Sequence, residues 1–173
     1  GFEDSARKAS EFGYDGIELA LKTADEISPD SLAKLLDKWN LEVSCISTGQ
    51  VFASLGLYFT HKDPVIRKRA VDVFSGLIHL AKDFGKIVNV GRARGFIEKG
   101  QTREEAEKLF LDMIDRLCYI AGPLGVTIVI EPVNRYEINF INTLDEGREL
   151  LKKIKCENIG LMPDVFHMNI EDD

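Results

Sequence analysis

The chain has 173 residues, of which 45% are hydrophobic, and this is enough apolar material for one globular domain with a sizeable core. Its formal net charge of -7 argues against nucleic acid and anionic membranes as partners, because phosphate binding depends on Lys and Arg. No apolar run approaches the roughly 20 residues of a membrane span, and no signal peptide is recognisable. The sequence therefore predicts a soluble, cytoplasmic protein that binds a small molecule.

The three cysteines, Cys45, Cys118 and Cys156, are an odd number and show no CxxC spacing. Neither a disulfide framework nor a zinc site is indicated. We expect buried, reduced thiols.

Helical patterns alternate with short apolar runs along the whole chain. Helices are predicted, in chain order, over residues 2–13, 28–40, 63–85, 102–125 and 142–156. Each leads into a predicted strand, over residues 14–21, 41–48, 86–91, 126–133 and 158–164. Three of the helix starts carry capping signals, namely Ser28 before Pro29, Asp63 before Pro64, and Thr102 in capping-box spacing with Glu105.

This alternation predicts an α/β fold with a parallel sheet and right-handed crossovers, either open or closed into a barrel. In both architectures ligands gather at the carboxyl ends of the strands. The candidate site residues are therefore those at which each apolar run stops.

Glu131 gives the sharpest signal, because it ends the β-prone run VTIVIE and Pro132 halts the strand directly after it. A carboxylate held on a rigid strand end is suited to bind a divalent metal or to move a proton. The alternative is that Glu131 only caps a loop or pairs with Arg135.

Asp164 ends the next predicted strand in the same way. Adjacent parallel strands lie about 4.8 Å apart, so carboxylates from both strand ends can reach one cation. Without a cation the two would repel each other, and one would take up a proton. His167, expected in the loop after Asp164, could ligate the metal or bind a substrate hydroxyl.

Other candidates carry weaker signals. Glu18 is compatible with a role towards substrate or with a buried hydrogen bond. The segment GRARG, residues 91–95, could cradle a phosphate, but a glycine-permitted turn is the better interpretation. The loop VFASLGLYFTH, residues 51–61, brings Phe52, Tyr58 and Phe59 either to a pocket wall or against the following helix. His61 and His79 are expected to be solvated or packed.

Two stretches, IEPVNRYEINFINTLDEG (130–147) and MPDVFHMNIED (162–172), resemble the D-tagatose 3-epimerase and D-psicose 3-epimerase family, within the class of xylose isomerase-like barrels. The resemblance implies a (β/α)8 TIM barrel that binds one divalent cation, commonly Mn2+, with Co2+ or Mg2+ as substitutes. It implies that the protein is an isomerase, a ketose 3-epimerase that acts on free ketohexoses, and that it forms a homo-oligomer.

The resemblance also implies residue roles. Glu131 matches the glutamate that ligates the metal and removes the C3 proton to give a cis-enediolate. Asp164 matches an aspartate ligand, and Glu137 and His167 match residues that contact substrate oxygens. A second glutamate of the family returns a proton on the opposite face.

A barrel of this type takes about 250 residues, whereas the chain supplies about five strand-helix units. We expect residues 1–173 to be a single TIM-barrel domain, partial at both ends. The family's histidine ligand and second catalytic glutamate are expected on two further strands.

Three alternatives remain open, namely hydroxypyruvate isomerase, an epimerase of phosphorylated sugars that uses the arginines of GRARG, and a non-catalytic sugar-binding relative. Endonucleases of the endonuclease IV type share the barrel but need several zinc-binding histidines and a basic face. Three histidines and a charge of -7 argue against that function.

Overall fold

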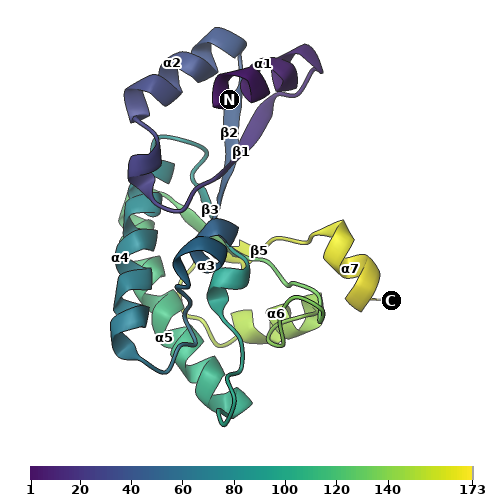
Figure 1. Ribbon diagram of the computed structural model, residues 1–173. Helices are drawn as coiled ribbons and strands as arrows, with labels where there is room; N and C mark the ends of the chain where they lie inside the picture. Colours follow the sequence, from purple (N-terminus) through teal and green to yellow (C-terminus); the bar gives the residue numbers. More distant parts are fainter. Residues whose placement is uncertain (173) are drawn as a thin grey trace.

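The computed structural model describes residues 1–172, and its centre is one parallel sheet of five strands in the order β1-β2-β3-β4-β5 (Figure 1). The strands are β1 Gly16–Ala20, β2 Glu42–Ser47, β3 Ile87–Val90, β4 Thr127–Ile130 and β5 Ile159–Leu161. This order is that of consecutive strand-helix-strand units with parallel strands, and it confirms the predicted α/β architecture.

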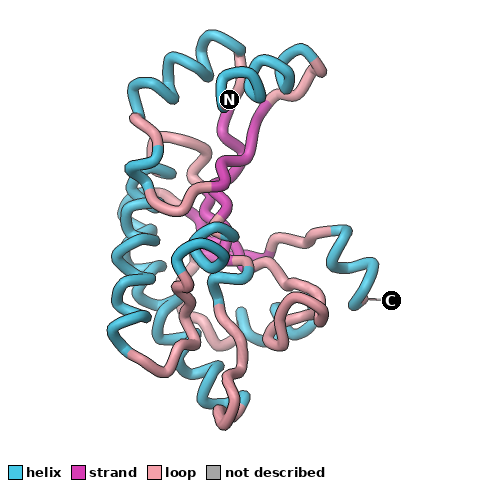
Figure 2. Tube along the Cα trace, in the orientation of Figure 1, coloured by secondary structure: helices cyan, strands magenta, loops and turns pink. Residues whose placement is uncertain are grey.

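Helices connect the strands, and most of them lie along one side of the sheet (Figure 2). The α-helices are α1 Phe2–Glu11, α2 Pro29–Trp39, α3 Gly49–Leu55, α4 Pro64–Ala81, α5 Arg103–Ala121, α6 Leu144–Leu151 and α7 Val165–Glu171. The 3-10 turns are η1 Ala24–Glu26, η2 Arg92–Arg94 and η3 Gly122–Leu124. Helices α4 and α5 run side by side, and α7 stands apart on the opposite side of the sheet (Figure 1).

The core lies between the sheet and the helices α4 and α5. Val88 and Ile128 in the central strands and Phe74 and Phe110 in these helices are all fully buried. Removing such side chains from water is the main favourable term for folding, about 25 cal/mol per Å² of apolar surface. The core thereby holds β3 and β4 in fixed register, and β4 is one of the two strands at whose ends the candidate site lies.

Two of the predicted helix caps are confirmed by hydrogen bonds. Asp63 accepts from the backbone N–H of Val65 at 2.8 Å, and Thr102 forms a capping box with Glu105. Ser28 occupies the N-cap position of α2, but its side chain makes no capping hydrogen bond.

Two short helices were not predicted. The segment expected as the loop 51–61 contains most of α3, and the loop expected after Asp164 is α7, with Asp164 as its N-cap through the N–H of Phe166 at 2.7 Å. Both helices have seven residues, too few for a clear helical period. The last predicted helix is also shorter than expected, because α6 ends at Leu151 rather than at residue 156.

The prediction of three reduced cysteines is wrong for two of them. Cys118 in α5 forms a disulfide with Cys156, which precedes β5, and their Cα atoms are 6.2 Å apart. The two cysteines are 38 residues apart, and only the packing of α5 beside this segment brings them together, so spacing gave no signal. Cys45 is buried and free, as expected.

Among residues 1–172, none of the helices combines the length and the apolar character that crossing a membrane requires.

Candidate active site

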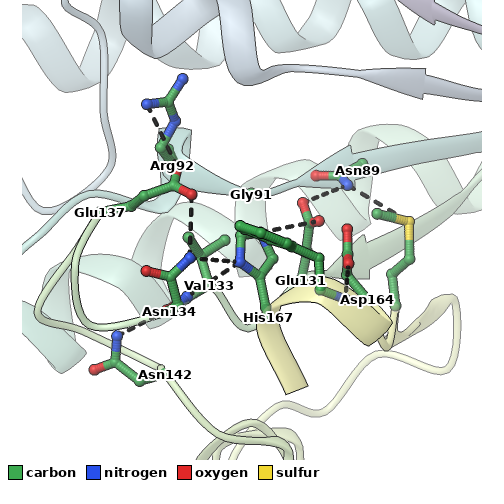
Figure 3. A network of polar contacts seen from close by, with 12 residues as sticks. Asn89, Gly91, Arg92, Glu131, Val133, Asn134, Glu137, Asn142, Asp164 and His167 are labelled. Carbon is green, nitrogen blue, oxygen red and sulfur yellow. Dashed lines mark hydrogen bonds and ion pairs between the residues drawn. The ribbon is translucent and has the colours of Figure 1, made fainter. Parts of the chain in front are cut away.

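The ends of β4 and β5 bring Glu131, Asp164 and His167 together (Figure 3). Ile130 is paired with Leu161, so Glu131 and the segment before Asp164 leave the sheet at the same level. One ligand atom of each of the three residues lies within 4.8 Å of the others, and His167 Nε2 lies 3.8 Å from Glu131 Oε1. The predicted meeting of the two carboxylates is thus seen in the structure.

Glu131 is held by Asn89 on β3 and by Gly91, which directly follows this strand. Asn89 Nδ2 donates a hydrogen bond to Glu131 Oε2 at 2.9 Å. The same oxygen packs against Gly91, where an added Cβ would lie only 2.7 Å from it. These contacts hold Oε2 against β3 while Oε1 faces His167 (Figure 3).

Burial raises the pKa of the Glu131 carboxyl above its ordinary value. The hydrogen bond from Asn89 opposes this rise, and the negative charge of Asp164 adds to it. Only 14% of the Glu131 side chain is exposed. Such a carboxylate is poorly solvated, so a bound cation or a transferable proton would stabilise it.

The alternative partner of Glu131, Arg135, is engaged elsewhere. Its guanidinium forms an ion pair of 2.8 Å with Glu171 in α7. The interpretation of Glu131 as the ion-pair partner of Arg135 is therefore wrong.

His167 and Glu137 are linked through Asn134. Asn134 Nδ2 lies 2.8 Å from His167 Nδ1 and donates to Glu137 Oε1 at 3.1 Å. Glu137 Oε2 in turn lies 3.6 Å from Arg92. All four residues predicted for the site, Glu131, Glu137, Asp164 and His167, therefore belong to one cluster, and their individual roles stay predictions (Figure 3).

Two residues of the site were missed, namely Asn89 and Asn134. Asn89 is 2% exposed, and a polar residue inside the apolar run KIVNVG could have indicated a buried partner. Arg94 is fully buried in the turn of GRARG. The turn interpretation of this segment is confirmed by η2.

The weaker candidates divide between the core and the site. Phe59 packs against Phe74 in the core, whereas Phe52 packs against Tyr58 and lies 5.8 Å from the guanidinium of Arg92. Glu18 lies on β1 in register with Cys45, and Glu18 is exposed to solvent.

Comparison with known proteins identifies the family of the chain. The model of the xylose isomerase-like TIM barrel family matches residues 6–173. A probable ketose 3-epimerase of Synechocystis is 30% identical over 99% of this chain and 58% of its own length. The D-psicose 3-epimerase of Agrobacterium fabrum is 29% identical over 96% of this chain and 58% of its own length.

Solved structures share the fold of this chain. D-allulose 3-epimerase from Methylomonas in complex with D-allulose superimposes with a TM-score of 0.82 at 28% identity, covering 99% of this chain and 60% of that one. D-psicose 3-epimerase from Clostridium cellulolyticum shares the fold, with a TM-score of 0.86 at 23% identity over 99% of this chain and 61% of that one. The chain thus spans about three-fifths of the length of these relatives. It belongs to the xylose isomerase-like TIM barrel family.

Proposed function

We propose that the protein is a metal-dependent ketose 3-epimerase that interconverts C3 epimers of free ketohexoses. The observation that carries the proposal is the meeting of Glu131, Asp164 and His167 at two adjacent strand ends. The relatives named as ketose, D-psicose and D-allulose 3-epimerases support it.

The proposed role of Glu131 is to take the proton from C3 of the ketose, leaving a cis-enediolate. A base for this step needs a fixed position and a pKa raised towards neutrality. Asn89 provides the position and burial provides the shift in pKa. Inversion at C3 then requires a proton from the opposite face of the enediolate.

The donor set fits a divalent cation. Glu131 and Asp164 offer carboxylate oxygens at short range, and these are the ligands that Mn2+ and Mg2+ prefer. Glu131 is also too buried for water to compensate its charge fully. A cation bound there would act as a Lewis acid on the substrate oxygens. We propose Mn2+, with Co2+ or Mg2+ as substitutes.

Glu137 and His167 are proposed to bind substrate oxygens. His167 lies 3.8 Å from Glu131, and Asn134 links His167 to Glu137 (Figure 3). A cytoplasmic location and a homo-oligomeric state remain proposals that rest on the kinship with these enzymes.

Solvent exchange at C3 tests the proposed reaction directly. In the protein that carries this chain, Glu131→Gln should abolish the exchange of the C3 hydrogen of D-fructose or D-psicose with deuterium from D2O in the presence of Mn2+. The control is Glu157→Gln, an exposed glutamate before β5, which should exchange at the wild-type rate. Exchange by Glu131→Gln at the wild-type rate would exclude Glu131 as the base, and no exchange by the wild type would favour a non-catalytic sugar-binding protein.

A phosphorylated ketose is the second candidate substrate, because the side chain of Arg92, beside Glu137, is 37% exposed. Arg94, the other arginine of GRARG, is buried and bound to backbone carbonyls. A higher kcat/KM for a ketose phosphate than for the free ketose, with loss of that preference in Arg92→Met, would favour this candidate.

A further inference from the structure

The side-chain amide of Asn134 has a defined orientation. Its Oδ1 accepts a hydrogen bond from the backbone N–H of Tyr136 at 3.0 Å, and a backbone N–H can only donate. Its Nδ2 donates to the carboxylate Oε1 of Glu137 at 3.1 Å. If the amide oxygen and nitrogen were exchanged, the NH2 group would face the N–H of Tyr136, and the oxygen would face the carboxylate of Glu137. The group that faces His167 is therefore the NH2 group.

His167 Nδ1 consequently faces two donors. Asn134 Nδ2 lies 2.8 Å from it, and the backbone N–H of Asn134 points to it at 3.4 Å. The backbone donor does not depend on how the amide is oriented. Asn134 and His167 are 2% and 9% exposed, so water competes poorly for these bonds. Nδ1 must therefore be an acceptor, and in the neutral ring the proton lies on Nε2.

The Nε2 atom is the one that faces the candidate site. It lies 3.8 Å from Glu131 Oε1, too far for a good direct hydrogen bond. A metal ion needs a ring nitrogen with a free lone pair. Ligation through Nε2 would move the ring proton to Nδ1, directly against the two N–H groups of Asn134.

We propose that Asn134 is a positioning residue that fixes the neutral ring of His167 as the Nε2–H tautomer. In this tautomer Nε2 is a donor, as the contact with a substrate oxygen proposed above requires, and it has no free lone pair for a metal ion. Of the three clustered groups, only Glu131 and Asp164 are then ligands. The part of this inference that concerns substrate rests on the proposed function, whereas the tautomer does not.

Nitrogen-15 NMR of the protein labelled in histidine tests the inference without any assay of activity. Two-bond proton-nitrogen correlations distinguish the Nε2–H ring, the Nδ1–H ring and the cation. In this chain His79 is an internal standard, because its Nδ1 lies 2.7 Å from the carbonyl of Ser75 and must donate. His61 is the opposite standard, because its Nδ1 accepts from the N–H of Asp63 at 2.9 Å.

We expect the Nε2–H pattern for His167 in the metal-free protein, and the same pattern after addition of Zn2+, a diamagnetic ion that favours imidazole. In Asn134→Asp a carboxylate faces the ring, so Nδ1 should become protonated while the signals of His61 and His79 stay unchanged. A purely structural role of Asn134 would not predict this reversal.

Three results would overturn the inference: an Nδ1–H pattern in the wild type, loss of the Nε2 proton on binding Zn2+, or an unchanged Nε2–H pattern in a folded Asn134→Asp protein. If Asn134→Asp does not fold, the wild-type spectra with and without Zn2+ still decide. If His167 shows the Nε2–H pattern but the wild-type protein does not exchange the C3 hydrogen of the ketose, the proposed function is rejected and the inference about the tautomer stands.

Discussion

Arg94 donates a hydrogen bond from Nη1 to the backbone carbonyl of Glu131 at 2.7 Å, and so attaches the turn after β3 to the end of β4. The same guanidinium donates to the carbonyls of Gly91, Phe140 and Ile141 at 3.0, 2.7 and 2.6 Å. Burial lowers the pKa of Arg94 to about 9, which still leaves it charged at neutral pH. A buried cation thus organises the loop that carries Asn134 and Glu137.

We expect Arg94→Lys to destabilise the protein by about 2–4 kcal/mol, because one ammonium group cannot reach carbonyls on both sides of the loop and some would remain buried without a donor. Urea unfolding measures the change. Arg92→Lys is the matched control on the same turn, and its half-exposed side chain should change stability by no more than about 0.5 kcal/mol. Equal effects of the two substitutions would contradict the role of Arg94.

The fold could be predicted from the sequence because its signals are local. The caps at Asp63 and Thr102 and the apolar runs around Val88 and Ile128 each lie within a few residues. The helix α7 escaped prediction because its seven residues are too few for a clear helical period. The contact of Cys118 with Cys156 depends on packing across the fold, which spacing does not encode.

Divalent metal should stabilise the folded protein through Glu131 and Asp164, because a ligand that binds only the folded state raises stability. In the protein that carries this chain, Mn2+ should raise Tm, and a chelator should reverse the rise. Asp164→Asn should weaken Mn2+ affinity, measured by calorimetry, at least tenfold. Glu157→Gln should bind Mn2+ as the wild type does, and unchanged affinity in Asp164→Asn would remove this residue from the ligand set.

The pH dependence of stability should report the burial of Glu131. Its pKa is raised in the folded state above the ordinary 4.5, so the ionised carboxylate destabilises the folded protein at pH above both values. Below the ordinary value both states are protonated, and the penalty vanishes. In the presence of a chelator, Glu131→Gln should therefore have a higher Tm than the wild type at about pH 7, and this difference should disappear towards about pH 4.

Differential scanning fluorimetry across this pH range measures the effect, with Glu157→Gln as the exposed control. Asn89 can still donate to the amide oxygen of a glutamine at position 131, so the comparison changes mainly the charge. A Tm difference that stays constant with pH would show that ionisation of Glu131 is not its cause.

The sequence predicts those site residues that come at or just after the end of a strand. Glu131 and Asp164 are recognisable because each comes at the end of an apolar, strand-like run, and parallel strands bring their carboxyl ends together. Asn89 and Asn134 act through hydrogen bonds to residues 42 and 33 positions away, to Glu131 and His167 respectively. No spacing rule connects such pairs, because the register of β3 against β4 and the path of the following loop determine them.

The state of the cysteines gives a last prediction. Digestion without reductant after alkylation should yield a peptide with Cys118 linked to Cys156, and Cys45 should be alkylated only when the protein is unfolded first. Burial raises the pKa of the Cys45 thiol to about 12, and the nearby charge of Glu18 adds to the rise, so the native thiol is almost entirely protonated near pH 8.

Replacing Cys118 and Cys156 together by serine should lower stability by about 2–4 kcal/mol, because a disulfide restricts the unfolded chain and this one closes a loop across 38 residues. The control is Cys45→Ala, which leaves the disulfide in place and should keep the linked peptide. Alkylated Cys118 and Cys156 in the unreduced digest, without the linked peptide, would show that the two thiols lie side by side but stay reduced. In that case the double substitution should lose only the packing of Cys118, which is 4% exposed, and reductant should leave the Tm of the wild type unchanged.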